Sequence, residues 1–350
     1  MARARTVLAV LALVACGIGL AAFAGPAAAY HHLQKGVAYT GYWRDAYEGP
    51  GADRALAPRR ATGAPWACVL VTGYQNTVDS TSIDRSSDAT PTDASLVRAI
   101  RRAHELHLRV MLKPHVDLAS DPSHWRGQIG PAFGDDEWAA WFASYREFIV
   151  HYAQLAADTG CEQFSVGCEL DSTVGHEAEW RALVAAVRAV FHGTLTYADD
   201  MVEWDPQAVA WWDRVDLIGE DAYPTLTREL HPTVADLLRG WRTSYLPELK
   251  ALADRWGKPV ILTEIGYRSI LGGAQQPADW QREGPVDLQV QARAYSAALT
   301  VVAHRGWIRG LYWWQWEPDP AAGGEKDTGF SPHGKPAEKI LRTWYRDRLL

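Results

Sequence analysis

Cysteine is scarce in this chain, whose 350 residues include only four cysteines. Cys16 lies in the apolar N-terminal stretch, and the other three show neither the CxxC nor the Cys/His spacing of a zinc site. Because an odd number remains outside that stretch, no disulfide framework is implied. Cys68 and Cys168 fall within predicted strands, where a thiol serves as a small buried hydrophobic group. The sequence therefore predicts a fold that packing alone stabilises.

A surplus of positive charge is also lacking, and so are the glycine-rich phosphate motifs. The net charge is −7, so the chain has no basic excess with which to neutralise phosphates. Neither G-x-G-x-x-G nor G-x-x-x-x-G-K-[ST] occurs. These absences argue against a nucleic-acid partner, a polyanionic substrate and a nucleotide, and we predict no cofactor.

Long apolar runs are confined to the N-terminus. Arg3 and Arg5 precede an apolar run from residue 7 to about 23, and three alanines end at Ala29. This pattern predicts an export signal cleaved after Ala29. Two alternatives are a lipoprotein cleavage box, LVAC, that would leave Cys16 acylated and the protein tethered to a membrane, and an uncleaved anchor. Residues 1–29 are thus interpreted as a leader and residues 30–350 as one exported domain, expected to be a monomer.

Beyond the leader, short apolar strands alternate with amphipathic helices, which is typical of a parallel sheet covered by helices. Eight strands are expected, at Gly36–Gly41, Ala67–Gly73, Arg109–His115, Gln163–Glu169, Thr194–Ala198, Leu217–Asp221, Pro259–Glu264 and Gly310–Gln315. Helices are expected at Pro91–Leu106, Asp135–Asp158, His176–Phe191, Val234–Trp256, Leu288–His304 and Lys335–Leu349. The pattern predicts a single-domain (β/α)₈ TIM barrel.

Two connections fit this pattern less well. Residues 44–65 are rich in glycine and proline, so their helix is expected to be short or missing. The fifth connection offers only a short helix around Pro206–Trp212. An open doubly wound sheet would show a similar alternation, but it would carry a glycine-rich turn after its first strand, and none is present.

Polar and aromatic residues collect where the predicted strands end, which is the face that carries the active site of a barrel. The chain has 17 tryptophans and 14 tyrosines, more flat amphipathic rings than a core requires. Such rings suit surfaces that stack on sugars. The predicted substrate-binding residues at this face are Trp43, Asn76, Lys113, His115, Asp221, Tyr223, Trp314 and Trp316.

Two glutamates stand out among these strand ends. Glu169 follows the apolar run FSVGC, and Glu264 ends PVILTE just before a glycine. Retaining glycosidases hold two carboxyl groups about 5–5.5 Å apart, one to protonate the leaving oxygen and one to attack the anomeric carbon. Their environments must separate the two pKa values, and Lys113, His115 and Tyr223 are candidates for the hydrogen-bond donors.

Five ordered motifs resemble the retaining (β/α)₈ glycoside hydrolases of clan A, and within it family 113, the β-1,4-mannanases. They are KPHVD from residue 113, GCEL from residue 167, GEDAYP from residue 219, TEIGY from residue 263 and YWWQW from residue 312. The resemblance implies Glu169 as acid/base and Glu264 as nucleophile. It further implies that Tyr223 orients the nucleophile and that Trp314 forms a platform beneath a sugar. The implied substrate is β-1,4-mannan.

One position departs from the pattern of that clan, whose members often have asparagine just before the acid/base, bonded to the sugar 2-hydroxyl. Here that position is Cys168, and a thiol is a poor substitute for an amide. Either Asn76, Lys113 or His115 makes this contact, or the preference at the 2-position differs.

Other interpretations remain open at this point. The protein could be a clan relative with another specificity, acting on β-glucan or from the chain end, or a carbohydrate-binding barrel without turnover. Glu220 is interpreted as structural or outward-facing. Asp199, Asp200 and Asp221 lack the dense spacing of a hard-metal site, and no metal is predicted. The outer packing layer is expected to hold Trp138, Trp141, Trp211 and Trp212, whereas Trp313 is a further subsite candidate.

Overall fold

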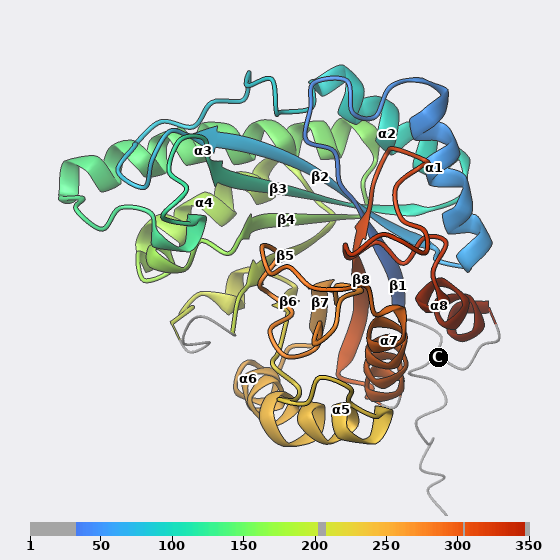
Figure 1. Ribbon diagram of the computed structural model, residues 1–350. Helices are drawn as coiled ribbons and strands as arrows, with labels where there is room; N and C mark the ends of the chain where they lie inside the picture. The colour runs from blue at the N-terminus through green and yellow to red at the C-terminus, as the bar shows by residue number, and fades with distance from the viewer. Residues whose placement is uncertain (1–32, 202–207, 304, 347–350) are drawn as a thin grey trace, which may run out of the picture.

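The computed structural model describes residues 33–201, 208–303 and 305–346, and these form a closed barrel of eight parallel strands (Figure 1). Each strand pairs with its neighbours in chain order, and β8 closes the ring against β1. The strands are β1 (Gln34–Tyr39), β2 (Trp66–Gln75), β3 (Arg109–Leu118), β4 (Gln163–Cys168), β5 (Thr194–Asp199), β6 (Leu217–Ala222), β7 (Val260–Ile265) and β8 (Ile308–Trp316). The predicted (β/α)₈ architecture is confirmed.

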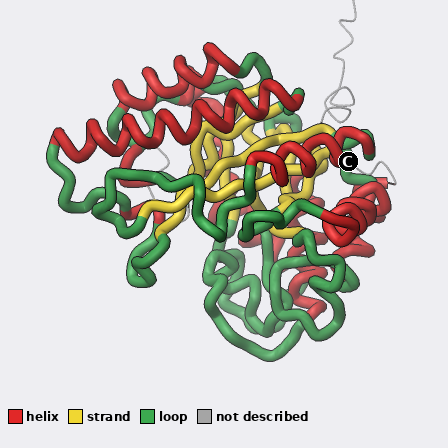
Figure 2. Tube along the Cα trace, turned by 90° about the horizontal axis from the view of Figure 1, so that it is seen from above, coloured by secondary structure: helices red, strands yellow, loops and turns green. Residues whose placement is uncertain are grey.

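Helices flank the strands on the outside of the barrel (Figure 2). They are α1 (Gly49–Thr62), α2 (Asp93–Glu105), α3 (Asp135–Thr159), α4 (Glu177–Val190), α5 (Val234–Gly240), α6 (Leu246–Trp256), α7 (Leu288–Val302) and α8 (Pro336–Arg346). Over the residues that are described, none of these helices has the length and apolarity needed to cross a membrane. The predicted leader, residues 1–29 with Cys16, lies outside the described residues.

The alternation of side chains along the strands divides the apolar residues into two cores. A small cluster fills the barrel interior and includes Cys68, Met111, Ile261 and Tyr312. A much larger one lies between the strands and the helices. Cys68, Cys161 and Cys168 are all buried, and none of these three described cysteines forms a disulfide.

The helix that was expected to be short or missing between residues 44 and 65 is present as α1. The prediction was wrong because proline is tolerated at its start: Pro50 lies in the first turn, where a backbone N–H has no helical partner. Packing supplies the rest of the reason, since Ala52, Ala55 and Leu56 are buried. Tertiary contact therefore outweighs the poor local propensity of this segment.

Two other predicted helices differ from the structure. The segment Val234–Trp256, expected to be continuous, is interrupted by a π-helical turn, Trp241–Tyr245, and resumes as α6. Pro247 lies at the start of α6 and has no N–H to give to the preceding turn, which explains the break. In the fifth connection the described residues contain only a 3₁₀ turn, Trp212–Arg214, while residues 202–207 lie outside the description.

Candidate active site

A buried lysine forms the centre of the candidate site. Lys113, on β3, points from the strand into a group of carboxylates and is fully buried. Its Nζ lies 2.8 and 2.7 Å from the two carboxylate oxygens of Asp221 on β6 and 2.7 Å from Oε1 of Glu264 on β7. These three contacts match the three hydrogens of an ammonium group. Burial lowers the pKa of Lys113, but the surrounding groups, Asp221 first and then Glu264 among them, together outweigh this effect and hold the pKa well above its usual value.

Glu264 receives a second donor from the opposite side. The Tyr223 hydroxyl donates to Oε2 of Glu264 at 2.7 Å, while Lys113 donates to Oε1. Burial raises the pKa of Glu264, and Asp221 adds to the rise, whereas Lys113 and Tyr223 oppose it. Burial and the nearby Glu264 raise the pKa of Tyr223, so its hydroxyl keeps its proton. Glu264 is therefore a carboxylate fixed in one orientation by two charge-stabilising donors.

Glu169 follows β4 directly and occupies a different environment. Its backbone is in the left-handed region, with φ of 51°, which is uncommon for a residue other than glycine. Its side chain is 15% exposed, and its partner is Arg126, whose Nη1 lies 3.2 Å from Oε2. Burial raises the pKa of Glu169 well above its usual value, opposed by Arg126 and reinforced by Asp221 and Glu264. This carboxyl group is thus suited to carry a proton near neutral pH.

Arg126 is the site residue that the sequence did not reveal. It lies in a 3₁₀ turn, Arg126–Gln128, of the connection between β3 and α3. Besides Glu169 it contacts Nδ1 of His115 at 3.1 Å and Sγ of Cys168 at 3.5 Å. In the sequence it is a single cation in an irregular connection, and no motif or regular spacing relates its position to that of Glu169.

The contact with Arg126 fixes the tautomer of His115. A guanidinium group only donates, so Nδ1 of His115 must accept and the proton must be on Nε2. Burial lowers the pKa of His115 well below its usual value, and the charges of Lys113 and Arg126 lower it further, which keeps the ring neutral. Nε2 has no hydrogen-bond partner and lies 3.6 Å from Oε1 of Glu264. The imidazole ring stacks on Trp314, with centroids 6.2 Å apart.

Cys168 lies close to both glutamates. Its thiol donates to Oδ2 of Asp221 at 3.3 Å, and burial raises its pKa, so the sulfur remains a neutral thiol. A carboxylate oxygen of Glu169 lies within 4.8 Å of Sγ, and so does one of Glu264. Two glutamates with unlike surroundings therefore lie near the same small side chain.

Two sets of possible metal ligands occur among the described residues, His115 with Cys168 and Glu264, and Cys168 with Glu169 and Asp221. Their chemistry does not suit a cation. Nε2 of His115 carries a proton, and the ammonium group of Lys113 already occupies the carboxylate oxygens of Asp221. The predicted structural role of Glu220 agrees with its contacts, since it is buried and accepts from the Tyr245 hydroxyl and from Met201 N.

Of the other predicted substrate-binding residues, only Trp314 lies within the group around Lys113, among the aromatic and amide side chains that the structure describes. Trp314 is half-buried beside His115, within the group. Trp316 is 2% exposed and packs on His333, so the structure does not bring it to the face that Trp314 occupies. Trp43 is 43% exposed in the loop after β1, and Asn76 is exposed after β2, with its carbonyl accepting from Ser120 N.

Trp313 is not a subsite residue, contrary to the prediction. It is fully buried and stacks on Tyr295 of α7, with centroids 3.6 Å apart, so it faces the helical layer. The tryptophans expected in the outer layer do pack there: Trp141 donates to Gln75, Trp211 stacks on Trp180 and Trp212, and Trp138 contacts Phe133 and His176.

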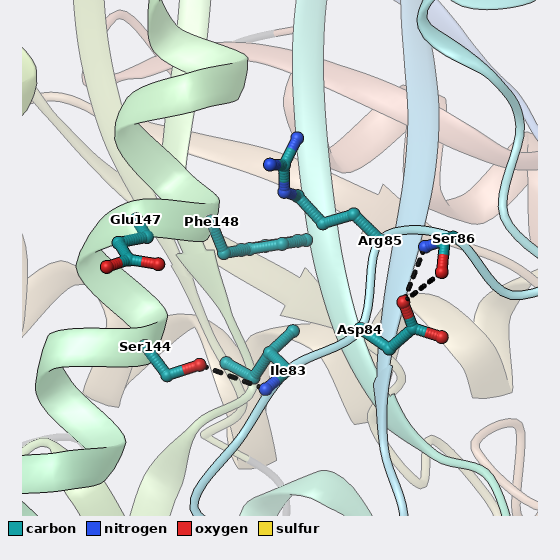
Figure 3. A pocket seen from close by; sticks show the side chains of 7 residues that line it. All are labelled: Ile83, Asp84, Arg85, Ser86, Ser144, Glu147 and Phe148. Atoms are coloured by element: carbon teal, nitrogen blue, oxygen red, sulfur yellow. Dashed lines mark hydrogen bonds between the residues drawn. The ribbon is translucent and has the colours of Figure 1, made fainter.

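A pocket of about 370 Å³ lies away from this group, between α3 and the segment 83–86 (Figure 3). The Ile83 backbone N–H donates to Ser144 Oγ at 2.9 Å on one side of it, and Arg85 and Glu147 lie on its walls. None of the described residues that line this pocket belongs to the group around Lys113. The candidate active site is placed at Glu169 and Glu264 because of the contacts described above, and this pocket is separate from it.

Replacing Lys113 by methionine is expected to lower the free energy of unfolding by about 3–5 kcal/mol, because the substitution leaves Asp221 and Glu264 buried without their cation. Urea unfolding followed by fluorescence measures this change. The matched control is Lys250→Met, which removes an exposed pair with Asp254 and should cost no more than about 0.5 kcal/mol. Equal effects of the two substitutions would contradict the central role of Lys113.

Comparison with known proteins agrees with this geometry. Two structures described as family 113 β-1,4-mannanase, one of them a complex, are 28% and 29% identical to the chain, with TM-scores of 0.80 and 0.81. Each comparison covers 90% of this chain and 99% of the other. The β-mannanase AaManA of the same family, from Alicyclobacillus acidocaldarius and in complex with ManMIm, is 29% identical, with a TM-score of 0.79 over 91% of this chain and 99% of its own.

A search of curated proteins gave no match. The sequence profile of Glycoside Hydrolase Family 113, however, matches residues 38–335, which is most of the chain. Together with the closed eight-stranded barrel, this match shows that the chain is a glycosidase of clan A and belongs to Glycoside Hydrolase Family 113.

Proposed function

We propose that this protein hydrolyses β-1,4-mannan with retention of configuration, with Glu264 as nucleophile and Glu169 as acid/base. The observation that carries the proposal is the unlike support of the two carboxyl groups. Lys113 and Tyr223 both donate to Glu264 and favour its ionised form, whereas burial gives Glu169 a pKa suited to hold a proton. Separated environments of this kind mark the acid and the nucleophile of a double displacement.

In the first step the Glu169 carboxyl donates its proton to the glycosidic oxygen as the bond from that oxygen to the anomeric carbon breaks. A carboxylate oxygen of Glu264 attacks the same carbon from the opposite face and forms a glycosyl ester. As negative charge leaves Glu264, the ammonium group of Lys113 stays paired with Asp221, so no buried cation loses its partner.

In the second step Glu169, now ionised, removes a proton from a water molecule that attacks the anomeric carbon and releases Glu264. Arg126 stabilises this ionised form, because its guanidinium group lies 3.2 Å from Oε2. Arg126 therefore assists the base of the second step and opposes the acid of the first. It is a positioning residue in this mechanism, since it acts through Glu169.

The mannan assignment is supported by the relatives, three structures of family 113 described as β-mannanases at 28–29% identity over nearly their full lengths. Initial rates on β-mannan, β-glucan and xylan test it. We expect hydrolysis of mannan, and ¹H NMR early in the reaction should show the β-anomer of the product first. Binding of these glycans without cleavage would favour the carbohydrate-binding alternative, and preferred cleavage of glucan or xylan would favour another clan A specificity.

Replacing Arg126 by methionine is expected to move the alkaline limb of the pH profile of kcat/KM to higher pH. A cation beside a carboxylate lowers the pKa of that carboxylate, so its removal raises the pKa of Glu169 and the acid form persists to higher pH. The control, Arg126→Lys, keeps the charge and should keep the limb closer to its original position. An alkaline limb that Arg126→Met leaves in place, or moves to lower pH, would count against Glu169 as the acid.

A further inference from the structure

We propose that the loop between β7 and α7 carries a second sugar-binding site, outside the catalytic centre, which holds a neutral sugar unit of a long polysaccharide chain. This inference rests on the proposed function, because it extends the substrate beyond the sugar that reacts. Four observations lead to it: a braced loop, an exposed tryptophan, a polar cavity and the position of both at the catalytic end of the barrel.

The loop is held in one shape by its own contacts. A pair of antiparallel backbone bonds closes its base at Ile270 and Val286. Arg268 then braces its interior, donating to the backbone carbonyls of Trp280, at 2.9 Å, and Arg282. The backbone at Trp280 is therefore held from within the loop, and the exposure of this residue does not reflect a lack of local structure.

Trp280 is 69% exposed, more than any other large hydrophobic residue in the part of the chain that the structure describes. An indole ring buries a large apolar area when it finds a partner, so a ring that a braced loop leaves open to water indicates a surface that a ligand covers. Sugar rings present flat C–H faces that stack on such rings. The occupant that fits a glycosidase is therefore a sugar unit of its own substrate.

A cavity adjoins the base of the same loop. Its volume is about 590 Å³, within the range of small-molecule sites, and it is lined by Arg268, Glu283, Gly284 and Thr328. The lining offers donors and acceptors, and the charges of Arg268 and Glu283 are opposite in sign. A site of this composition provides hydrogen bonds for hydroxyl groups without favouring an anion or a cation, which suits a neutral sugar.

The cavity lies at the same end of the barrel as the catalytic carboxylates. Arg268 is four residues beyond Glu264, a distance of at most about 14 Å along the chain. On the other wall, Thr328 precedes Phe330 by two residues, and the Phe330 ring meets the ring of Tyr223 at 6.1 Å. Because Tyr223 donates to Glu264, one continuous set of contacts joins the cavity wall to the nucleophile. A chain seated at Glu264 can therefore reach the loop.

The test compares long and short substrates in the Trp280→Ala variant. For polymeric mannan we expect kcat/KM to fall about tenfold, mainly through KM, which corresponds to about 1.4 kcal/mol. For an aryl β-mannoside with a single sugar, kcat/KM should not change, because that substrate does not reach the loop. Trp280→Phe should restore most of the loss on the polymer. The control, Leu230→Ala, removes another exposed apolar side chain, 46% exposed, and should leave both activities unchanged.

An equal effect of Trp280→Ala on the two substrates, or no effect on either, overturns the inference while leaving the proposed function standing. Sedimentation of wild type and variant tests the alternative that Trp280 contacts a second copy of the protein. Loss of self-association in the variant, with unchanged kinetics, would show that Trp280 lies in such an interface. If the wild-type protein cleaves neither substrate, the proposed function fails, and the inference fails with it.

Discussion

Replacing Glu264 by glutamine should reduce hydrolysis of mannan by about 10⁴-fold or more, because the amide cannot form the glycosyl ester. The substitution keeps the shape of the side chain, and the amide oxygen can still accept from Lys113 or Tyr223. The folded structure should therefore survive, with substrate binding largely retained. Initial rates on mannan together with thermal unfolding measure the two effects separately.

The Glu264→Ala variant distinguishes a nucleophile from a carboxylate with another role. Its cavity admits a small anion such as azide, which can attack the anomeric carbon of an activated β-mannoside from the face that Glu264 occupied. One displacement inverts the configuration, so the expected product is the α-mannosyl azide. The matched control is Glu220→Gln. Glu220 is another buried glutamate of the barrel and accepts a hydrogen bond from Tyr245, so this variant should keep the hydrolytic activity of the wild type. Near-normal turnover by Glu264→Gln would rule out the assigned role.

Replacing Glu169 by glutamine is expected to reduce hydrolysis of mannan by about 10²–10⁴-fold, the usual contribution of general acid–base catalysis. The reason is that an alkoxide leaving group needs a proton, which an amide does not supply. The pKa of Glu169, raised by its burial, is what makes that proton available in the wild-type protein. Rates on mannan and on a dinitrophenyl β-mannoside measure the difference.

The dinitrophenyl substrate distinguishes an acid from a merely structural carboxylate, because its leaving group departs without protonation. In Glu169→Gln the first step should stay fast on this substrate, and the glycosyl ester should accumulate as a burst of dinitrophenol. Added azide should then release the β-mannosyl azide, the product of two displacements. A uniform loss of rate on both substrates, without a burst, would show that Glu169 supports the structure and not the proton transfer.

Much of the site could be predicted because strand ends converge in a barrel. Once the alternation of strands and helices indicated a closed ring, Glu169, Asp221 and Glu264 had to lie at the same face. Period-two alternation also placed Lys113 and His115 together, as the structure has them. These residues were accessible to sequence reasoning because regular secondary structure relates their positions.

The rest depended on irregular segments and on packing. Arg126 reaches the catalytic group from a loop, where no period relates a residue to its spatial neighbours. Trp313 and Trp316 were assigned to the cleft because aromatic residues cluster there, but both pack into the outer layer against Tyr295 and His333. The helix α1 formed despite its prolines, because Ala52, Ala55 and Leu56 are buried.

The structure also narrows the question raised by Cys168. Of the three residues considered as donors to the sugar 2-hydroxyl, Lys113 has all three hydrogens committed to carboxylates, and Asn76 is exposed after β2. His115 retains a proton on Nε2 with no partner, next to Glu264. Of the donors on Lys113 and His115, the imidazole N–H is therefore the one that remains available beside Glu264.

The central claim is that Glu264 becomes covalently attached to the sugar. Incubation with a 2-deoxy-2-fluoro-mannosyl fluoride, which forms the ester faster than water cleaves it, followed by peptic digestion and mass spectrometry, tests it directly. One labelled peptide containing Glu264 is expected, with no label in Glu264→Gln. A label on another residue, or turnover of mannan with inversion and no trapped ester, would contradict it.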